Sequence, residues 1–95
     1  MVERRVAFDV LPGKELEFEV FFAREYRPAM SAMPGFVRVE LVRDRQSPST
    51  YCMLIRFESD EAAAAWRASE AHQALKPRLA SLHRGSSLAI YDVIA

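Results

Sequence analysis

The stretch TYCMLIRFESDEAAAAW, residues 50–66, changes from a strand pattern to a helix pattern within a few positions. Apolar side chains recur at every second position: Tyr51, Met53, Ile55 and Phe57. This alternation predicts a strand over Thr50–Phe57. Ser59 is a favourable helix N-cap residue, and Asp60 and Glu61 suit the first turn, where the helix dipole favours acidic side chains. The stretch therefore predicts a strand that leads directly into a helix.

Upstream of this stretch, segments with a strand pattern and a segment with a helix pattern also follow one another. Val6–Leu11 and Phe36–Arg43 carry strand patterns, and Lys14–Met33 carries a helix pattern. The pairs Pro12-Gly13 and Pro34-Gly35 separate these segments, as expected at turns. The short polar loop before Thr50 predicts that the second and third strands form a hairpin.

The first predicted helix is amphipathic. Projection at about 100° per residue gathers most of its apolar side chains into one arc: Leu16, Phe18, Val20, Phe22, Ala23, Tyr26, Ala29, Met30 and Met33. Such an arc must pack against another element. Phe21 falls outside the arc among charged neighbours, which makes it a candidate contact with a partner subunit.

Downstream, the helix that starts at Ser59 is predicted to break at Ser69 and to be disturbed near Pro77. Gly85 is predicted to close the helical region, before a last strand over Leu88–Ile94. The order βαββαβ predicts an α+β, ferredoxin-like fold, with both helices on one face of an antiparallel sheet. Residues 1–95 are predicted to form a single domain.

Both faces of the predicted sheet look largely apolar. In the third strand, Cys52 and Leu54 point to the face opposite that of the apolar row. In the last strand, Ala89 and Tyr91 point to the face opposite that of Leu88 and Ile90. Two helices cover only one face, so the other face requires a partner. A second copy, packed sheet against sheet, is the simplest partner, and a homodimer is predicted.

Composition excludes several classes of protein. Hydrophobic residues make up 51% and charged residues 27% of the chain, which is typical of a globular domain. The 13 basic and 13 acidic residues give zero net charge, which argues against a nucleic-acid partner. Asp9 interrupts the N-terminal apolar run, so no signal peptide is predicted, and no uncharged stretch approaches the roughly 20 residues that span a bilayer. The single Cys52 favours a reducing compartment, and a cytoplasmic location is predicted.

Several motifs together resemble the antibiotic biosynthesis monooxygenase domains, a family of the dimeric α/β-barrel group. They are FDVLPGKELEFE at the first strand–helix junction, MPGF at the exit of the first helix, and YCMLIRFESDEAAAAW followed by SEAH. The similarity extends over nearly the whole chain. It implies two protomers that pair their sheets into a barrel, each with a pocket between its own sheet and helices.

The resemblance implies several chemistries, because the family is less uniform in activity than in fold. One branch oxygenates anthrone- or quinol-like substrates without a cofactor, another degrades haem, and another isomerises a small phosphorylated sugar. The haem branch carries a histidine ten residues after the tryptophan, where this chain has Lys76, so haem is not expected. The anthrone branch carries an asparagine and a tyrosine where this chain has Ala62 and His72.

Trp66 and His72 are the predicted catalytic residues. Trp66 would hold a flat aromatic ring, and a neutral His72 would take a proton from a phenol, since the imidazole pKa suits neutral pH. Two plainer interpretations stay open. Trp66 fills the space beside four alanines as a core anchor, and His72 is an exposed or capping residue.

The predicted substrate-binding residues are Tyr26, Tyr51, Arg38, Phe22 and Met53. No metal site and no cofactor is predicted, because no His, Cys, Asp or Glu cluster has metal-ligand spacing. The function predicted on these grounds is a cofactor-independent monooxygenase that oxidises a small aromatic substrate. The alternatives are a non-oxidative enzyme, such as an isomerase of a small metabolite, and a non-catalytic dimer that binds a ligand.

Overall fold

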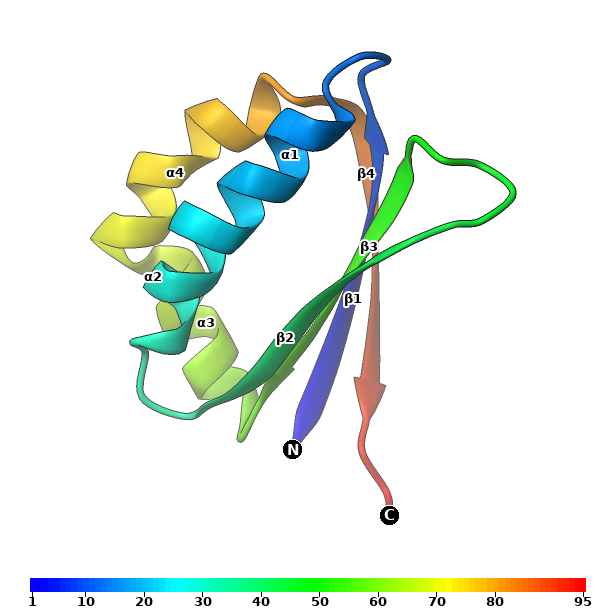
Figure 1. The fold of residues 1–95 in the computed structure, drawn as a ribbon. Coiled ribbons are helices and arrows are strands. Elements are labelled where there is room, and N and C mark those ends of the chain that lie inside the picture. Colours follow the sequence, from blue (N-terminus) through cyan, green and yellow to red (C-terminus); the bar gives the residue numbers. More distant parts are fainter.

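The computed structural model describes residues 1–95 and contains one antiparallel sheet with helices on one face (Figure 1). In chain order the elements are β1 (Val2–Val10), α1 (Glu15–Phe21), a π-helical turn η1 (Phe22–Tyr26), α2 (Arg27–Ser31), β2 (Phe36–Arg43), β3 (Thr50–Phe57), α3 (Asp60–Ala68), α4 (Glu70–Ala80) and β4 (His83–Asp92). The strands lie in the order β2-β3-β1-β4. The predicted α+β, ferredoxin-like fold is confirmed.

The first and last strands of the sequence differ from their predicted bounds, whereas β2 and β3 match theirs. β1 starts at Val2, because its whole length pairs with both β3 and β4. β4 starts at His83, so the prediction that Gly85 closes the helical region is wrong. Gly85 lies inside β4 opposite Asp9, next to a shift in register, and glycine is common at such irregularities.

The first helical segment is continuous but not a regular α-helix. Its middle is the π-helical η1, in which the N–H of Arg27 donates to the carbonyl of Phe22. This wider turn directly precedes Pro28, which has no N–H to donate and would clash in a regular helix interior.

The side chains of this segment that face the core differ in part from the predicted arc. Phe18, Phe22, Tyr26 and Met30, spaced by four, are all buried, while Leu16 of the predicted arc is exposed. Phe21 is fully buried, so its predicted role as a contact with a partner subunit is wrong.

The break between α3 and α4 is where the sequence predicts it. The Ser59 hydroxyl accepts from the Ala62 N–H at 3.2 Å and caps α3. Ser69 ends α3 with extended backbone and caps α4, accepting from the His72 N–H at 3.1 Å. Pro77 does not break α4, which continues to Ala80. No helix is both long and apolar enough to cross a membrane.

The core lies between the helices and the sheet face formed by alternate strand residues. Tyr51, Met53, Ile55 and Phe57 of β3 are buried there, as the alternation predicts. Gly35 precedes β2 with φ +79°, and a Cβ built on it would lie 2.6 Å from the Cβ of Ala62. Glycine at this position therefore serves both the turn and the close approach of α3.

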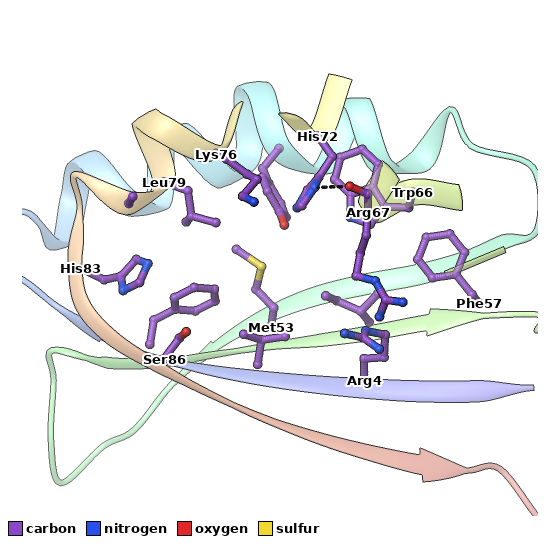
Figure 2. A pocket seen from close by; sticks show the side chains of 15 residues that line it. Arg4, Met53, Phe57, Trp66, Arg67, His72, Lys76, Leu79, His83 and Ser86 are labelled. Carbon is purple, nitrogen blue, oxygen red and sulfur yellow. Dashed lines mark hydrogen bonds between the residues drawn. The ribbon is translucent and has the colours of Figure 1, made fainter. Parts of the chain in front are cut away.

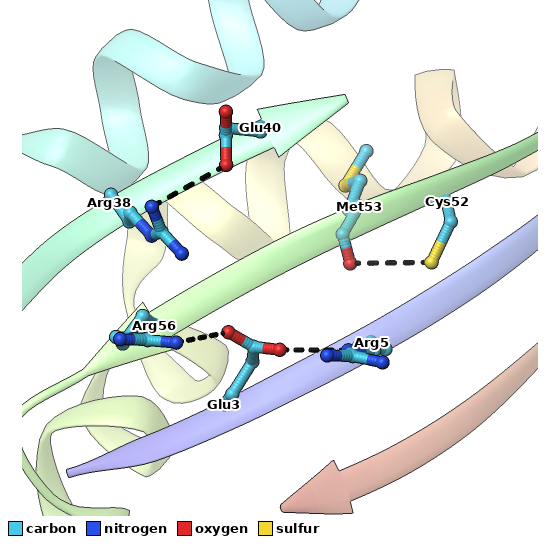
Figure 3. A network of polar contacts seen from close by, with 7 residues as sticks. All are labelled: Glu3, Arg5, Arg38, Glu40, Cys52, Met53 and Arg56. Carbon is cyan, nitrogen blue, oxygen red and sulfur yellow. Dashed lines mark hydrogen bonds and ion pairs between the residues drawn. The ribbon is translucent and has the colours of Figure 1, made fainter. Parts of the chain in front are cut away.

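The face of the sheet opposite the helices, termed here the outer face, is mixed rather than largely apolar, so that sequence-based expectation is wrong. Figure 3 shows Glu3 of β1 between Arg5 and Arg56, at 2.8 and 2.7 Å. Glu3 is only 6% exposed although no helix covers it, because these neighbours shield it. Arg38 and Glu40 of β2 form a longer, exposed pair at 3.7 Å.

Candidate functional site

A pocket of about 250 Å³ lies between the sheet and the helices, where the family resemblance implies one. Its floor is formed by inward side chains of β1, β3 and β4, and its roof by η1, α3 and α4 (Figure 2). Most of the lining is apolar, and the floor includes Val6, Phe8, Met53, Ile55 and Phe57. The space is sufficient for a small planar molecule, and Trp66 lines the pocket without filling it.

Trp66 is both a core side chain and a wall of this pocket. It comes from the last turns of α3 and is 3% exposed. Its ring centroid lies 5.5 Å from that of Tyr26 and 4.9 Å from that of His72, with edge-on geometry in both pairs. The two interpretations of Trp66 are therefore compatible: the ring anchors α3 and presents an aromatic surface to the pocket.

The cap at Ser69 positions His72 at the first turn of α4. The Nδ1 of His72 lies 3.0 Å from the carbonyl oxygen of Arg67. A carbonyl only accepts hydrogen bonds, so Nδ1 carries the proton and donates. Burial, with smaller effects of the Lys76 and Arg67 charges, lowers the pKa of His72, while its bond to the Arg67 carbonyl opposes this. At neutral pH the ring is therefore neutral, and its Nε2 is a free acceptor.

Tyr26 is the third member of this aromatic group. The π-helical turn ends at Tyr26, and its ring centroid lies 6.1 Å from that of His72. Burial raises the pKa of Tyr26 to about 12. The phenol therefore stays protonated at neutral pH and has a hydroxyl proton to donate to a polar group in the pocket.

Of the seven predicted site residues, the structure brings four together in this pocket: His72, Trp66, Tyr26 and Met53. Tyr51 and Phe22 lie instead at a second depression between the α1–η1 segment and the β2 side of the sheet, where the Tyr51 hydroxyl donates to Glu19. Arg38 is on the outer face, because its position alternates with the inward Val39.

Three cationic side chains and a second histidine that line the pocket were not predicted. Arg4 points inward because even-numbered residues of β1 do so, and the strand was predicted to start after it. Lys76 lies one helical turn after His72, a spacing that puts both on one face of α4. Arg67 directly follows Trp66. His83 is at the other end of the pocket, with its Nδ1 3.1 Å from the Gly85 carbonyl oxygen.

No group of three or more His, Cys, Asp or Glu side chains is placed to hold a metal ion. The pocket contains the two histidines but no carboxylate. Cys52 is in β3 on the outer face, and burial raises the pKa of its thiol, which disfavours the nucleophilic thiolate.

Comparisons with known proteins agree with the geometry. SnoaB, a cofactor-independent oxygenase from Streptomyces nogalater, is 26% identical, with a TM-score of 0.88 over 99% of this chain and 93% of that chain. PA3566 from Pseudomonas aeruginosa is 16% identical, with a TM-score of 0.82 over 99% and 94% of the two chains. A conserved protein from Methanosarcina mazei is 17% identical, with a TM-score of 0.84 over 96% and 91%. At these lower identities the last two show the shared fold alone.

A search of curated protein sequences finds no match. The family model described as antibiotic biosynthesis monooxygenase matches residues 1–78, which include the motifs quoted above and both Trp66 and His72. The chain therefore belongs to the antibiotic biosynthesis monooxygenase family.

Proposed function

We propose that this protein is a cofactor-independent monooxygenase that oxidises a small, electron-rich aromatic substrate. The observation that carries the proposal is the arrangement of His72, whose Nε2 is a free acceptor beside Trp66 in a pocket lined mainly by apolar and aromatic side chains. The description of SnoaB as a cofactor-independent oxygenase supports the same chemistry.

For an anthrone-like substrate the proposed reaction begins with proton transfer from the ring methylene to Nε2 of His72. The carbanion passes an electron to dioxygen, and the resulting substrate radical and superoxide combine into a peroxide anion. This anion takes the proton back from His72 and becomes a hydroperoxide. Loss of water then leaves a carbonyl. One oxygen atom enters the product and the other leaves as water, so the methylene loses the four electrons that dioxygen gains.

In this scheme the protein orients the substrate and makes it more acidic by stabilising the anion that remains after proton loss. Trp66 and Phe57 hold the ring flat in the pocket, and the protonated Tyr26 donates to the oxyanion that forms as the substrate loses its proton. His72 is suited to accept this proton because burial lowers its pKa, so the ring is neutral at neutral pH.

The proposal includes a homodimer and a cytoplasmic location. The sheet has no helix on its outer face (Figure 1), where Tyr91 of β4 is exposed. Leu88 and Ile90 of β4 are exposed on the opposite face, at the β4 edge, and Ile94 is exposed near the C-terminus. An exposed apolar edge beside a mixed polar face is suited to a second copy of the chain. The free thiol of Cys52 is consistent with a reducing compartment.

A second candidate is a non-oxidative enzyme, such as an isomerase, acting on a small anionic metabolite. Arg4 and Arg67 favour it, because two guanidinium groups facing one pocket suit a bound anion. The aromatic lining favours the oxygenase, and dependence of turnover on dioxygen separates the two.

The test is oxygen uptake with anthrones, naphthoquinols and catechols, measured against autoxidation without protein. The wild type should exceed autoxidation with at least one substrate class. The double variant Trp66→Phe, His72→Ala should return the rate to autoxidation, and Leu16→Ala, on the exposed side of α1, should not change it. Uptake equal to autoxidation for every compound, with turnover of a small phosphorylated metabolite without oxygen, would favour the isomerase.

A further inference from the structure

The charged side chains that line the pocket are all basic. Arg4, Arg67 and Lys76 line it together with His72 and His83, and no Asp or Glu does. Over the whole chain the 13 basic and 13 acidic residues balance. The positive charge is therefore concentrated locally, at the mainly apolar pocket between the sheet and the helices.

Arg4 is the least expected of these cations. It lies on the inward face of β1, where its neighbours in the alternation are Val2 and Val6, and it is half-buried. Burial is the main cause that lowers the pKa of Arg4, and the positive charge of Arg67 lowers it further, while Asp60 opposes this. Arginine stays charged even so, which leaves a partly desolvated cation near a like charge.

No carboxylate forms an ion pair with these cations, although the charge of Asp60 acts on Arg4 from a longer distance. Six other arginines form ion pairs: Arg5, Arg38, Arg43, Arg56, Arg78 and Arg84. None of the ion pairs within 4.0 Å includes Arg4, Arg67 or Lys76. A half-buried guanidinium without a counterion is unfavourable, and an anion bound from solution would relieve both the desolvation and the repulsion.

The basic side chains are unevenly distributed along the pocket, with the two arginines at one end. Figure 2 shows Arg67, from the roof, pointing down toward Arg4 on the floor, at the end of the pocket formed by Trp66 and Phe57. Lys76 lies nearer the middle, while His83 and Ser86 lie at the opposite end. A ligand whose ring lies against Trp66 can thus place a substituent between the two guanidinium groups.

We infer that the substrate carries an anionic oxygen group, a carboxylate or a phosphate, that binds between Arg4 and Arg67 while its aromatic ring occupies the apolar pocket. Guanidinium groups bind such groups through paired, charge-assisted hydrogen bonds. Lys76 adds a third positive charge near the substrate's reacting end, where it favours the anion formed by proton loss. This inference rests on the proposed function for the aromatic part of the substrate.

The first test measures binding without oxidation, by quenching of Trp66 fluorescence. The probes are two anthraquinones with the same ring system, rhein with a carboxylate and aloe-emodin with a hydroxymethyl group. Rhein should bind at least tenfold more tightly. This preference should disappear in Arg4→Met, Arg67→Gln, which keeps much of the aliphatic packing of both side chains, and persist in Arg45→Gln in the exposed β2–β3 loop.

Naphthoate and naphthyl phosphate, compared with naphthalene methanol, identify the anion. Tighter binding of either anionic compound, abolished in the arginine double variant, supports the inference and names the group. Equal binding of all three compounds would overturn it. Circular dichroism of the double variant confirms that it is folded, so that lost preference reports on the site.

The two proposals can fail separately. Rhein anthrone and chrysophanol anthrone differ only in a carboxylate and a methyl group, and both can be oxidised to the anthraquinone. If both are oxidised equally well and rhein binds no better than aloe-emodin, the anion site is wrong and the oxygenase stands. If neither is oxidised above autoxidation but the arginine-dependent preference for rhein holds, the anion site stands and the oxygenase is wrong.

Discussion

His72 shows how one residue acquires a defined chemical state from its backbone surroundings. The Ser69 hydroxyl accepts from its N–H, and the Arg67 carbonyl accepts from its ring. Gln73 also donates to the Arg67 carbonyl, at 2.7 Å, which helps to hold the junction between α3 and α4. The tautomer of His72 is therefore set by the helix break and not by an acidic side chain.

The pH dependence of turnover should report this state. Because burial lowers the pKa of His72, kcat/KM should fall as the pH decreases through a value below 6.5, where the ring becomes protonated and Nε2 can no longer accept a proton. Lys76→Gln removes a positive charge beside the ring, so the midpoint should move to higher pH. A midpoint that does not move in this variant, or one above 6.5, would contradict the assignment of His72 as the base.

Substitutions of Trp66 separate its two roles. Trp66→Ala should lower the free energy of unfolding by about 3–5 kcal/mol, because it leaves a cavity under α3. Trp66→Phe should cost roughly 1–3 kcal/mol and leave the protein folded. If Trp66 also orients the substrate, Trp66→Phe should lower kcat/KM at least tenfold at a temperature where denaturant unfolding shows full folding. Unchanged kcat/KM would leave Trp66 as a core anchor only.

At the scale of elements, the turn that leads into β2 approaches α3 unusually closely. Gly35 combines φ +79° with a position at which a Cβ would lie 2.6 Å from the Cβ of Ala62, whereas Gly13 combines φ +85° with open space. The two glycines therefore allow backbone strain alone to be compared with strain plus a steric clash.

Gly35→Ala should be more destabilising than Gly13→Ala. The positive φ costs each variant about 1–2 kcal/mol, and the clash adds to this only at Gly35. Ala62→Gly in the Gly35→Ala background should recover part of the loss, although glycine in a helix costs about 1 kcal/mol. Urea unfolding of these variants and the wild type measures this, and equal losses at the two glycines would refute the close-contact explanation.

The outer face carries a second element-scale feature, the contacts of Glu3 with Arg5 and Arg56. The hydrogen bond from Arg56, followed by that from Arg5, lowers the pKa of Glu3 from its usual 4.5. A lowered carboxyl pKa contributes stability above the unfolded-state value, and that contribution is lost as the pH falls through the folded-state value.

Glu3→Gln should lower the free energy of unfolding at pH 7 by about 1–3 kcal/mol, the range for hydrogen bonds to charged groups. The difference from wild type should shrink as the pH falls below 4.5. Glu40→Gln, which removes an exposed pair on the same face, should change stability by less than about 1 kcal/mol. Urea unfolding at several pH values tests this, and a Glu3→Gln effect independent of pH would contradict the ion-pair explanation.

At the scale of the whole molecule, the helices cover one face of the sheet and leave β4 and the outer face exposed. If a second copy covers that face, light scattering should give twice the 10.8 kDa mass of the chain. Leu54→Glu, in the middle of the outer face, should shift the protein toward monomer, because it places a buried charge at the contact. Leu16→Glu, on the exposed side of α1, should not. A wild type that is monomeric at high concentration would contradict the proposed dimer.

Local sequence patterns determined much of this architecture. The strict alternation in residues 51–57 fixes which side chains of β3 are buried, and Ser59 and Ser69 define the helix ends, because caps and alternation act over a few neighbouring residues. The motifs around Trp66 and His72 were sufficient to identify the family. That both Trp66 and His72 line one pocket was not determined by these motifs and is seen only in the structure.

Tertiary structure alone decided the rest. The burial of Phe21 depends on how the helices pack in the folded chain, and the inward position of Arg4 depends on how far β1 pairs with both neighbours. Arg4 and Arg67 are far apart in the chain, so no local pattern indicates that they share a pocket. Register and the packing of helices on the sheet are long-range properties, and here they determine which charges face the ligand.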